Sequence, residues 1–306
     1  MKAPTAKGQR THKNTFQAAG TPAAYFSFIL HSYAIIGRRI GNKYVCRRHS
    51  LSVDIPKDHP RRDSLIVRER LAEFVKKGLM TPTGLIAHGR GEAFDYLMGE
   101  RTTAAALNAE RVAAAYLMNA KRPVICVNGN AAALNAKRLI ELAEATGSKI
   151  EVNIFHRTEE RMKLLIDYMK ECGAPNVLGG DPDARIPGLS SDRALCTSEG
   201  IFASDVILVP IEDGDRAEAL VRMKKTVIAI DLNPLSRTSR MATVSINDEM
   251  SRALANMIGF AKGPSNKEKR NDIISQFSNE ENIRASVNEI RKYLLDAVSG
   301  EKNERS

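Results

Sequence analysis

Long apolar runs and a complete export signal are missing from this chain of 306 residues. An apolar stretch at residues 23–36 is too short to cross a membrane, and His31 interrupts it. A basic stretch precedes it, as in a signal peptide, but Arg38 and Arg39 close the run before any small-residue cleavage site. We therefore expect neither a membrane protein nor an exported one.

Closely spaced cysteines are missing as well. The four cysteines are Cys46, Cys126, Cys172 and Cys196, and no two of them form a CxxC pair. We therefore expect reduced thiols in a cytoplasmic protein. Cys126 lies inside an apolar stretch and is expected in the core.

Several motifs of nucleotide-dependent and hydrolytic enzymes are absent from the sequence. The chain has no GxxxxGK[ST], which excludes a P-loop NTPase, and no GxSxG or zinc-type HExxH. Gly89 and Gly91 form a GxG that lacks the remaining spacing of the dinucleotide fingerprint. A nicotinamide-dependent oxidoreductase is therefore only a weakly supported alternative.

Acidic residues are missing from residues 1–50, which hold nine Lys or Arg, although the whole chain has a net charge of +10. The remaining 256 residues are close to neutral, with 37 basic and 36 acidic side chains. A nucleic-acid binder would carry its basic excess on the folded module, so this class is disfavoured. A non-catalytic protein that binds its partner through residues 1–50 remains a rival interpretation. Our hypothesis is that translation begins near Leu51 or Val53 and that these residues are a dispensable basic extension.

From residue 54 onward, helical periodicity alternates with short apolar runs. The pattern predicts helices at 62–78, 91–98, 101–120, 131–146, 158–172 and 215–223, and strands at 84–88, 123–127, 149–155, 177–178, 205–210, 226–231 and 243–246. This is the rhythm of an α/β fold: a Rossmann-like open, mostly parallel sheet with helices on both faces. We expect this α/β domain at 51–262. A C-terminal helical tail at 263–306 is expected to pack on the domain or on a dimer partner.

Polar side chains gather where the predicted strands end. They are His88, Arg90, Asn128, Asn130, Arg157, Asp213, Asp215, Arg216, Asp231, Asn233 and Arg237. Because the carboxyl ends of parallel strands meet at one edge, which lines the ligand crevice, these side chains are expected to lie together. The loop that holds His88 and Arg90 and the loop at 231–240 suggest a two-part ligand, for example a nucleotide beside a phosphorylated acid. A simpler alternative for Asn130 is that it caps the following helix.

Two of these loops suggest particular roles. Asp231 ends an apolar strand, where a carboxylate accepts hydrogen bonds from ribose hydroxyls, and Arg237 and Thr238 then suit the adjoining phosphates. Residues 212–216 supply three carboxylates that would hold Mg²⁺ or position an amine, with Asp213 the functional member. The alternative is an acidic loop that stabilises the N-terminus of the next helix.

Seven segments resemble one enzyme family closely. They are IPKDHPR at 55–61, RERL at 68–71, GLIAHGRGEAFDYLMGE at 84–100, VNGN at 127–130, RTEER at 157–161, LVPIEDGDRAEALVRM at 208–223 and IDLNPLSRTSRMA at 230–242. Together they resemble the archaeal phosphopantothenate synthetases, the 4-phosphopantoate–beta-alanine ligases, from about Asp54 to Asp296. The resemblance implies a cytoplasmic homodimer that acts in coenzyme A biosynthesis. Its substrates would be ATP, 4-phosphopantoate and beta-alanine, and its products AMP, pyrophosphate and 4'-phosphopantothenate.

The same resemblance implies a set of ATP contacts. The positions that match the family pattern are Arg68, Arg90, Asp231, Leu232, Asn233, Arg237 and Thr238. One more contact falls after the last strand, where this chain has Asp248-Glu249-Met250 in place of the family's frequent Asp-Asn. Glu249 and Met250 are expected to contact adenine through the backbone, without a side-chain amide.

Hypotheses for the remaining roles follow from loop position. Arg90 and His88, with Lys57, are expected to offset the charge that builds up at the α-phosphate. Mg²⁺ is expected to bind together with ATP. Asn128, Asn130 and Arg157 are expected to bind phosphopantoate, with Arg157 pairing its phosphate. Asp213 is expected to orient the beta-alanine ammonium. The pattern assigns no metal ligands.

Overall fold

The computed structural model describes residues 55–59 and 61–299. They belong to one of the two units of the chain, Val45–Ser306, and the expected extension at 1–50 lies outside the described residues. The α-helices are α2 (Arg62–Lys76), α3 (Pro82–Leu97), α4 (Ala104–Asn119), α5 (Gly129–Thr146), α6 (Glu159–Glu171), α7 (Gly214–Arg222), α8 (Arg237–Met241), α9 (Met250–Lys262), α10 (Lys267–Ser275) and α11 (Asn279–Ser299). The strands are β1 (Pro123–Val127), β2 (Lys149–Val152), β3 (Val177–Leu178), β4 (Ala184–Arg185), β5 (Leu195–Cys196), β6 (Val206–Pro210), β7 (Thr226–Ile230) and β8 (Val244–Ile246).

Six strands form one parallel sheet in the order β3-β2-β1-β6-β7-β8. The central strands β1 and β6 are buried along their whole length, as their continuous apolar runs predict. From β1 the chain adds β2 and β3 toward one edge of the sheet, and from β6 it adds β7 and β8 toward the other edge. The order of strand addition therefore reverses between the two central strands. The predicted open parallel sheet is thereby confirmed, and its switch point lies between β1 and β6.

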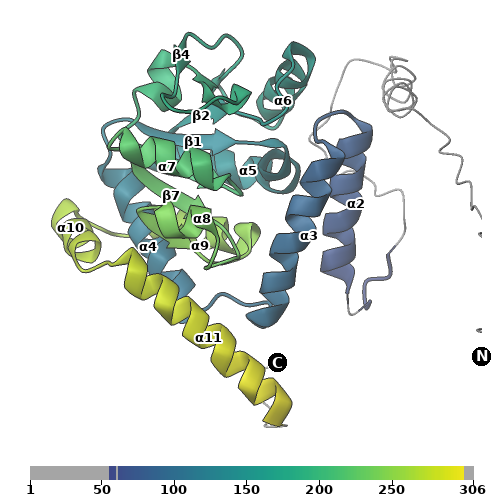
Figure 1. The fold of residues 1–306 in the computed structure, drawn as a ribbon, viewed down its shortest axis with the longest axis vertical. Helices are drawn as coiled ribbons and strands as arrows, with labels where there is room; N and C mark the ends of the chain where they lie inside the picture. Colours follow the sequence, from purple (N-terminus) through teal and green to yellow (C-terminus); the bar gives the residue numbers. More distant parts are fainter. Residues whose placement is uncertain (1–54, 60, 300–306) are drawn as a thin grey trace, which may run out of the picture. The chain divides into compact units, whose positions relative to one another are not determined.

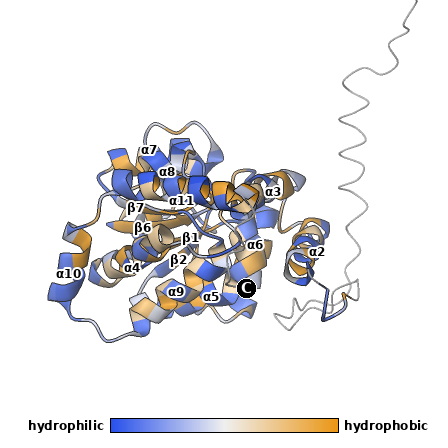
Figure 2. Cartoon of the chain, turned by 90° about the horizontal axis from the view of Figure 1, so that it is seen from below, coloured by the Kyte–Doolittle hydropathy of each residue, from blue (hydrophilic) through white to orange (hydrophobic). Residues whose placement is uncertain are grey.

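Helices cover both faces of this sheet. On one face α4 and α5 both pack against α9. On the other face α7 packs with α8, and Ala217 and Leu220 of α7 join Val209 and Ala229 in one buried cluster. Figure 2 shows the two groups of helices on opposite sides of the strands. The antiparallel pair β4 and β5, which the sequence pattern did not predict, closes the second face through Cys196.

The predicted strand at 84–88 is wrong, because these residues lie inside α3 (Figure 1). Thr81 precedes this helix in an extended conformation and Pro82 occupies its first turn, where proline's missing N–H costs no hydrogen bond. A short apolar run such as Leu85-Ile86-Ala87 fits a strand or a buried helix equally well. His88 and Arg90 therefore project from a helix that packs against α2 and α5, and not from a loop after a strand.

The helical tail is confirmed, and α11 packs against α4, α8 and β8. Asn279 makes much of this contact: its Nδ2 donates to the carbonyls of Ser239 at 3.0 Å and Ala242 at 2.9 Å. Its Oδ1 accepts from the N–H of Ser245 at 2.8 Å, at the edge of the sheet. The first turn of α11 is thus hydrogen-bonded to the last strand.

The thiols differ from one another. Cys126 and Cys196 are free and buried, as expected for Cys126. Burial raises the pKa of the Cys126 thiol and raises that of Cys196 to about 12, so neither is a reactive thiolate. The expectation of a reduced thiol is wrong for Cys172, which is disulfide-bonded.

Candidate active site at the carboxyl edge of the sheet

Asn128 joins the two strands of the switch point. It follows β1, and its Nδ2 donates to the carbonyls of Pro210 at 2.8 Å and Ile211 at 3.1 Å, at the end of β6. Its Oδ1 accepts from the N–H of Ala131 at 3.0 Å and so caps α5. The capping role considered for Asn130 thus belongs to Asn128, whose side-chain amide fixes the crevice between the strands.

Asn130 is turned toward α3 instead. Its side chain is buried, and its Nδ2 donates to the carbonyl of Gly84 at 3.2 Å. Its Oδ1 has no hydrogen-bond partner among the described residues. A buried amide oxygen without a donor costs free energy, so this atom is an acceptor that a ligand hydroxyl or N–H would satisfy.

Helix α3 lies across the carboxyl edge. Its Gly84 contacts Asn130 after β1, and a Cβ built on its Gly91 would lie 3.6 Å from Leu232 after β7. The field of Arg90 also acts on the carboxylate of Asp231. One helix thereby brings Arg90 next to loops from two strands. The sequence had placed Arg90 in a loop after a strand, and that part of the prediction is wrong.

His88 lies half-buried on the same helix. Its Nε2 has no hydrogen-bond partner within the described part of the chain. Burial lowers the pKa of His88, and the nearby carboxylates of Glu92 and Glu249 only partly oppose this. The imidazole is therefore mostly neutral at pH 7. A neutral ring donates or accepts a hydrogen bond at the site but does not offset phosphate charge.

Asp231 organises the loop after β7. One carboxylate oxygen accepts from the N–H of Asn233 at 3.0 Å and the other from Oγ of Ser236 at 2.5 Å. Burial raises the pKa of Asp231, while these hydrogen bonds and Arg90 oppose the rise. The carboxylate is held in place before any ligand arrives, as a group that accepts ribose hydroxyls must be.

The next residues connect this loop to α7. Thr238 is buried and its hydroxyl donates to the carbonyl of Glu212 at 2.7 Å. Arg237 is half exposed and pairs with the carboxylates of Asp215 and Glu218. A phosphate that binds Arg237 would have to compete with these two carboxylates or share the guanidinium with them.

The acidic loop after β6 is only partly available to a ligand. Glu212 is buried between Arg193, at 2.8 Å, and Arg216. Asp213 accepts from Arg193 at 3.1 Å but keeps 54% of its side chain exposed, and it makes no side-chain cap to α7. Asp215 is also exposed, at 69%, but it pairs with Arg237, so Asp213 is the exposed carboxylate of this loop that lies at its start, after β6.

The loop after β8 completes the edge. Asn247 donates through Nδ2 to the carbonyl of Asp231 at 2.7 Å and so joins the loops after β7 and β8. Glu249 caps α9 by accepting from the N–H groups of Ser251 at 2.8 Å and Arg252 at 3.1 Å. Its carboxylate acts on His88 of α3. The predicted adenine contacts thus lie beside α3 and Asp231.

Comparison with known proteins identifies the family of this chain. A family model described as phosphopantothenate/pantothenate synthetase matches residues 105–293. The chain belongs to this family. It is similar to the 4-phosphopantoate–beta-alanine ligase of Methanosarcina mazei, with 53% identity over 243 residues that cover 79% of this chain and 96% of the relative. It is also similar to the ligases of that name from Methanospirillum hungatei (55% over 206 residues, 67% and 84% coverage) and Thermococcus onnurineus (46% over 251 residues, 81% and 96%).

Three predicted residues lie at the periphery of the candidate site or have no contact with it. Arg157 follows β2, and its Nη2 donates to the carbonyls of Gly179 at 2.8 Å and Gly180 at 3.0 Å, which leaves the other side-chain nitrogens for a ligand. Arg68 is exposed on α2, whose Ser64 donates to Glu92 of α3 at 3.0 Å. Lys57 is exposed, and no hydrogen bond or ion pair between described residues joins it to this edge.

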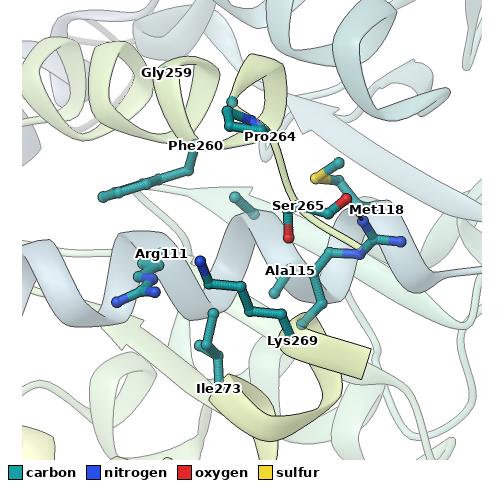
Figure 3. A pocket seen from close by; sticks show the side chains of 12 residues that line it. Arg111, Ala115, Met118, Gly259, Phe260, Pro264, Ser265, Lys269 and Ile273 are labelled. Atoms are coloured by element: carbon teal, nitrogen blue, oxygen red, sulfur yellow. Dashed lines mark hydrogen bonds between the residues drawn. The ribbon is translucent and has the colours of Figure 1, made fainter. Parts of the chain in front are cut away.

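A pocket of the described residues lies elsewhere. It has a volume of about 240 Å³ and lies between α4, α9 and α10, with Arg111, Phe260 and Lys269 among its lining residues (Figure 3). None of the predicted site residues lines it. Within the described residues, no group of three or more His, Cys, Asp or Glu is arranged to hold a metal ion, and no helix is long and apolar enough to cross a membrane.

Sequence reasoning missed the residues that hold the edge together. Asn247 has no chemical signature, because it acts through the carbonyl of Asp231. Gly129 was expected to expose backbone to a ligand, but its role in packing could not be predicted from the sequence. A Cβ on Gly129 would lie 2.9 Å from the carbonyl oxygen of Leu79, so only glycine lets α5 begin this close to the start of α3. The carboxyls of Glu110 and Asp248, described below, were missed because nothing local in the sequence shows that they are buried.

Proposed function

We propose that this protein is an ATP-dependent ligase that condenses 4-phosphopantoate with beta-alanine to 4'-phosphopantothenate, with release of AMP and pyrophosphate, in coenzyme A biosynthesis. The observation that carries this proposal is the identity of 46–55% to relatives named 4-phosphopantoate–beta-alanine ligase, over most of their lengths. The polar loops after β1, β6, β7 and β8, which share one edge with α3, support it independently. Cytoplasmic location belongs to the same proposal.

ATP is proposed to lie along the loops after β7 and β8. Asp231 would accept the ribose hydroxyls, and the backbone of Asn233 and Glu249 would contact the base. Arg237 and Arg90 would approach the phosphates from α8 and α3. Mg²⁺ is expected to enter with ATP, because it is commonly held by substrate phosphates with few protein ligands. We assign the metal ion no protein ligand.

The proposed reaction has two steps. An oxygen of the phosphopantoate carboxylate attacks the α-phosphorus of ATP, pyrophosphate leaves, and an acyl-adenylate forms. The neutral amine of beta-alanine then attacks the acyl carbon, the bond from that carbon to the adenylate oxygen breaks, AMP leaves, and the amine loses a proton. Arg90 would stabilise the charge in the first step, which a preorganised cation does without reorganisation.

The second substrate is proposed to lie at the switch point. The unpartnered Oδ1 of Asn130 would accept from a pantoate hydroxyl, and Arg157 would pair with its phosphate. Asn128 would act mainly by holding the loops after β1 and β6, because the structure already uses both ends of its amide. Asp213 would accept the beta-alanine ammonium and take up the proton that it releases.

The chain is also proposed to act as a homodimer, with its ligase domain at 51–262 and its helical tail at 263–306. Apolar side chains are exposed toward the end of α11, where Leu295 is 63% and Val298 81% exposed. Such a surface is typical of a subunit contact. Light scattering during gel filtration measures the mass directly, and a monomer at all concentrations would refute this part.

The function is tested with purified protein, ATP, 4-phosphopantoate and beta-alanine, by following 4'-phosphopantothenate with mass spectrometry. We expect product only when all three substrates are present. Reactions that each omit one substrate are the controls. Absence of product from the complete mixture, with turnover of NADH and a keto acid instead, would favour the oxidoreductase alternative.

A further inference from the structure

Glu110 of α4 is a buried carboxyl with an unusual set of partners. It is 0% exposed, and its Oε2 accepts from Nδ2 of Asn256 on α9 at 2.8 Å. Its Oε1 has no hydrogen-bond donor among the described residues. An ionised carboxylate would leave that oxygen charged and unsolvated, which is costly, whereas a protonated one can donate from it.

A second buried carboxyl, Asp248, faces Glu110. Its Oδ2 accepts from the hydroxyl of Thr102 at 2.6 Å. Its Oδ1 accepts from the N–H of Glu249 at 2.8 Å and from Nε and Nη2 of Arg252 at 3.0 and 2.7 Å. Asp248 therefore has the partners of an ionised carboxylate. The two carboxyls are close enough to interact through their side chains. A hydrogen bond between them requires a proton, and Glu110 must supply it because both oxygens of Asp248 already accept from other donors.

The charges around this pair agree with that assignment. Arg252 is the cation beside the two carboxyls, and it also donates to both oxygens of Asp95 on α3, at 3.2 and 2.5 Å. Asp95 and Asp248 already exceed its single charge. At the start of α4 the carboxylate of Glu289 accepts from the N–H of Ala105 and adds no cation. Burial and the neighbouring Asp248 raise the pKa of Glu110 to about 9.

The loop that Asp248 holds is part of the candidate site. Asp248 fixes the N–H of Glu249, whose carboxylate caps α9 and acts on His88. We propose that Glu110 is a positioning residue for nucleotide binding: as a neutral carboxyl it donates a hydrogen bond to Asp248 and thereby fixes the loop between β8 and α9 against the base. This inference rests on the proposed function, because it takes that loop as the adenine contact.

Titration of ATP into the full chain, by calorimetry with wild type, Glu110→Gln and Glu110→Ala, tests the proposal. Glutamine keeps a donor toward Asp248 and an acceptor for Asn256, so Glu110→Gln should bind ATP like wild type at about pH 7. Glu110→Ala should bind about three- to tenfold more weakly, as expected for one lost hydrogen bond. At about pH 10 the wild type should weaken by a similar factor because Glu110 ionises, while Glu110→Gln should not.

Glu144→Gln, which removes an exposed carboxylate from α5, is the control and should follow the wild type at both pH values. A parallel loss of affinity in wild type and Glu110→Gln between the two pH values would overturn the proposal. So would a Glu110→Gln protein that binds as weakly as Glu110→Ala at about pH 7. The comparison of wild type with Glu110→Gln decides the matter even if Glu110→Ala does not fold. Normal ATP binding without 4'-phosphopantothenate formation would instead refute the proposed function.

Discussion

At the scale of single residues, the candidate site consists of groups whose ionisation is set by the fold. Burial keeps His88 mostly neutral and raises the pKa of Asp231, whereas Arg90 is exposed and charged. The permanent cation on α3 is therefore the group that can stabilise a negatively charged transition state.

Arg90→Ala should lower kcat for the ligase reaction by about 10²–10³-fold, the usual cost of removing one preorganised electrostatic contact. Steady-state measurement of AMP formation gives this ratio. Arg284→Ala, which removes an exposed arginine of α11 that pairs with Glu280 outside the candidate site, should change it little. An unchanged rate for Arg90→Ala would remove this residue from the mechanism.

Glu110→Gln should stabilise the protein at pH 7. The pKa of Glu110 is raised from 4.5 to about 9 in the fold, so its contribution to stability is fully present below pH 4.5 and is lost as the pH rises toward about 9. At pH 7 the folded protein must take up a proton that the unfolded chain has lost, which costs at most about 3 kcal/mol. Glutamine avoids this cost.

Denaturant unfolding of wild type and Glu110→Gln at about pH 5, 7 and 9 measures the effect. The difference between the two proteins should grow with pH, because only the wild type has a carboxyl to protonate. A constant difference across this range would show that Glu110 is not protonated in the fold.

At the scale of secondary-structure elements, α3 separates what the sequence could predict from what it could not. The runs that form β6 and β7 are short, almost wholly apolar and rich in β-branched residues, which favours a buried strand. The run before His88 is equally apolar but sits on a helix, and Pro82 was the one local sign of it. The side of the sheet that α3 covers depends on tertiary contacts with α2 and α5, which no local pattern contains.

Gly89→Ala tests the helical assignment of α3. Gly89 lies inside the helix, and a Cβ built on it meets no atom within 4 Å. Alanine should therefore stabilise the protein by about 0.5–1 kcal/mol in denaturant unfolding, because it has the higher helix propensity. If Gly89 lay in a loop, as the sequence suggested, alanine would bring no gain in helix propensity and the free energy of unfolding would not rise.

Gly129→Ala is the contrasting variant, since its Cβ would lie 2.9 Å from the carbonyl oxygen of Leu79. It should destabilise the protein, because α5 cannot move away without pulling Asn128 from β6. Equal effects of the two substitutions would contradict the packing described for α3 and α5.

At the scale of the whole molecule, the sequence could predict which residues form the candidate site, but not the hydrogen bonds that hold them together. Parallel strand order brought the residues after β1, β6 and β7 to one edge, as their positions in sequence suggested. The network that connects the edge runs through Asn247, Asp248 and Glu110, whose partners are up to 146 residues away. Such long-range pairs leave no periodic signal in the sequence.

A protein that starts at Ser52 should keep full ligase activity if residues 1–50 are a dispensable extension. The expectation rests on their composition, with nine basic residues and no acidic one, and on the near-neutral charge of the remainder. Comparison of kcat/KM for the shortened and full chains measures it. Loss of activity with retained folding would favour a functional role for the basic segment.

The central claim is that the pantoate carboxylate attacks the α-phosphorus of ATP at the carboxyl edge of the sheet. Carboxylate-labelled [¹⁸O]4-phosphopantoate, incubated with the protein, ATP and beta-alanine, tests it most directly by mass spectrometry of the released nucleotide. An acyl-adenylate transfers one labelled oxygen to AMP, with pyrophosphate formed in equal amount. Release of ADP together with labelled inorganic phosphate would show an acyl-phosphate route and contradict the account.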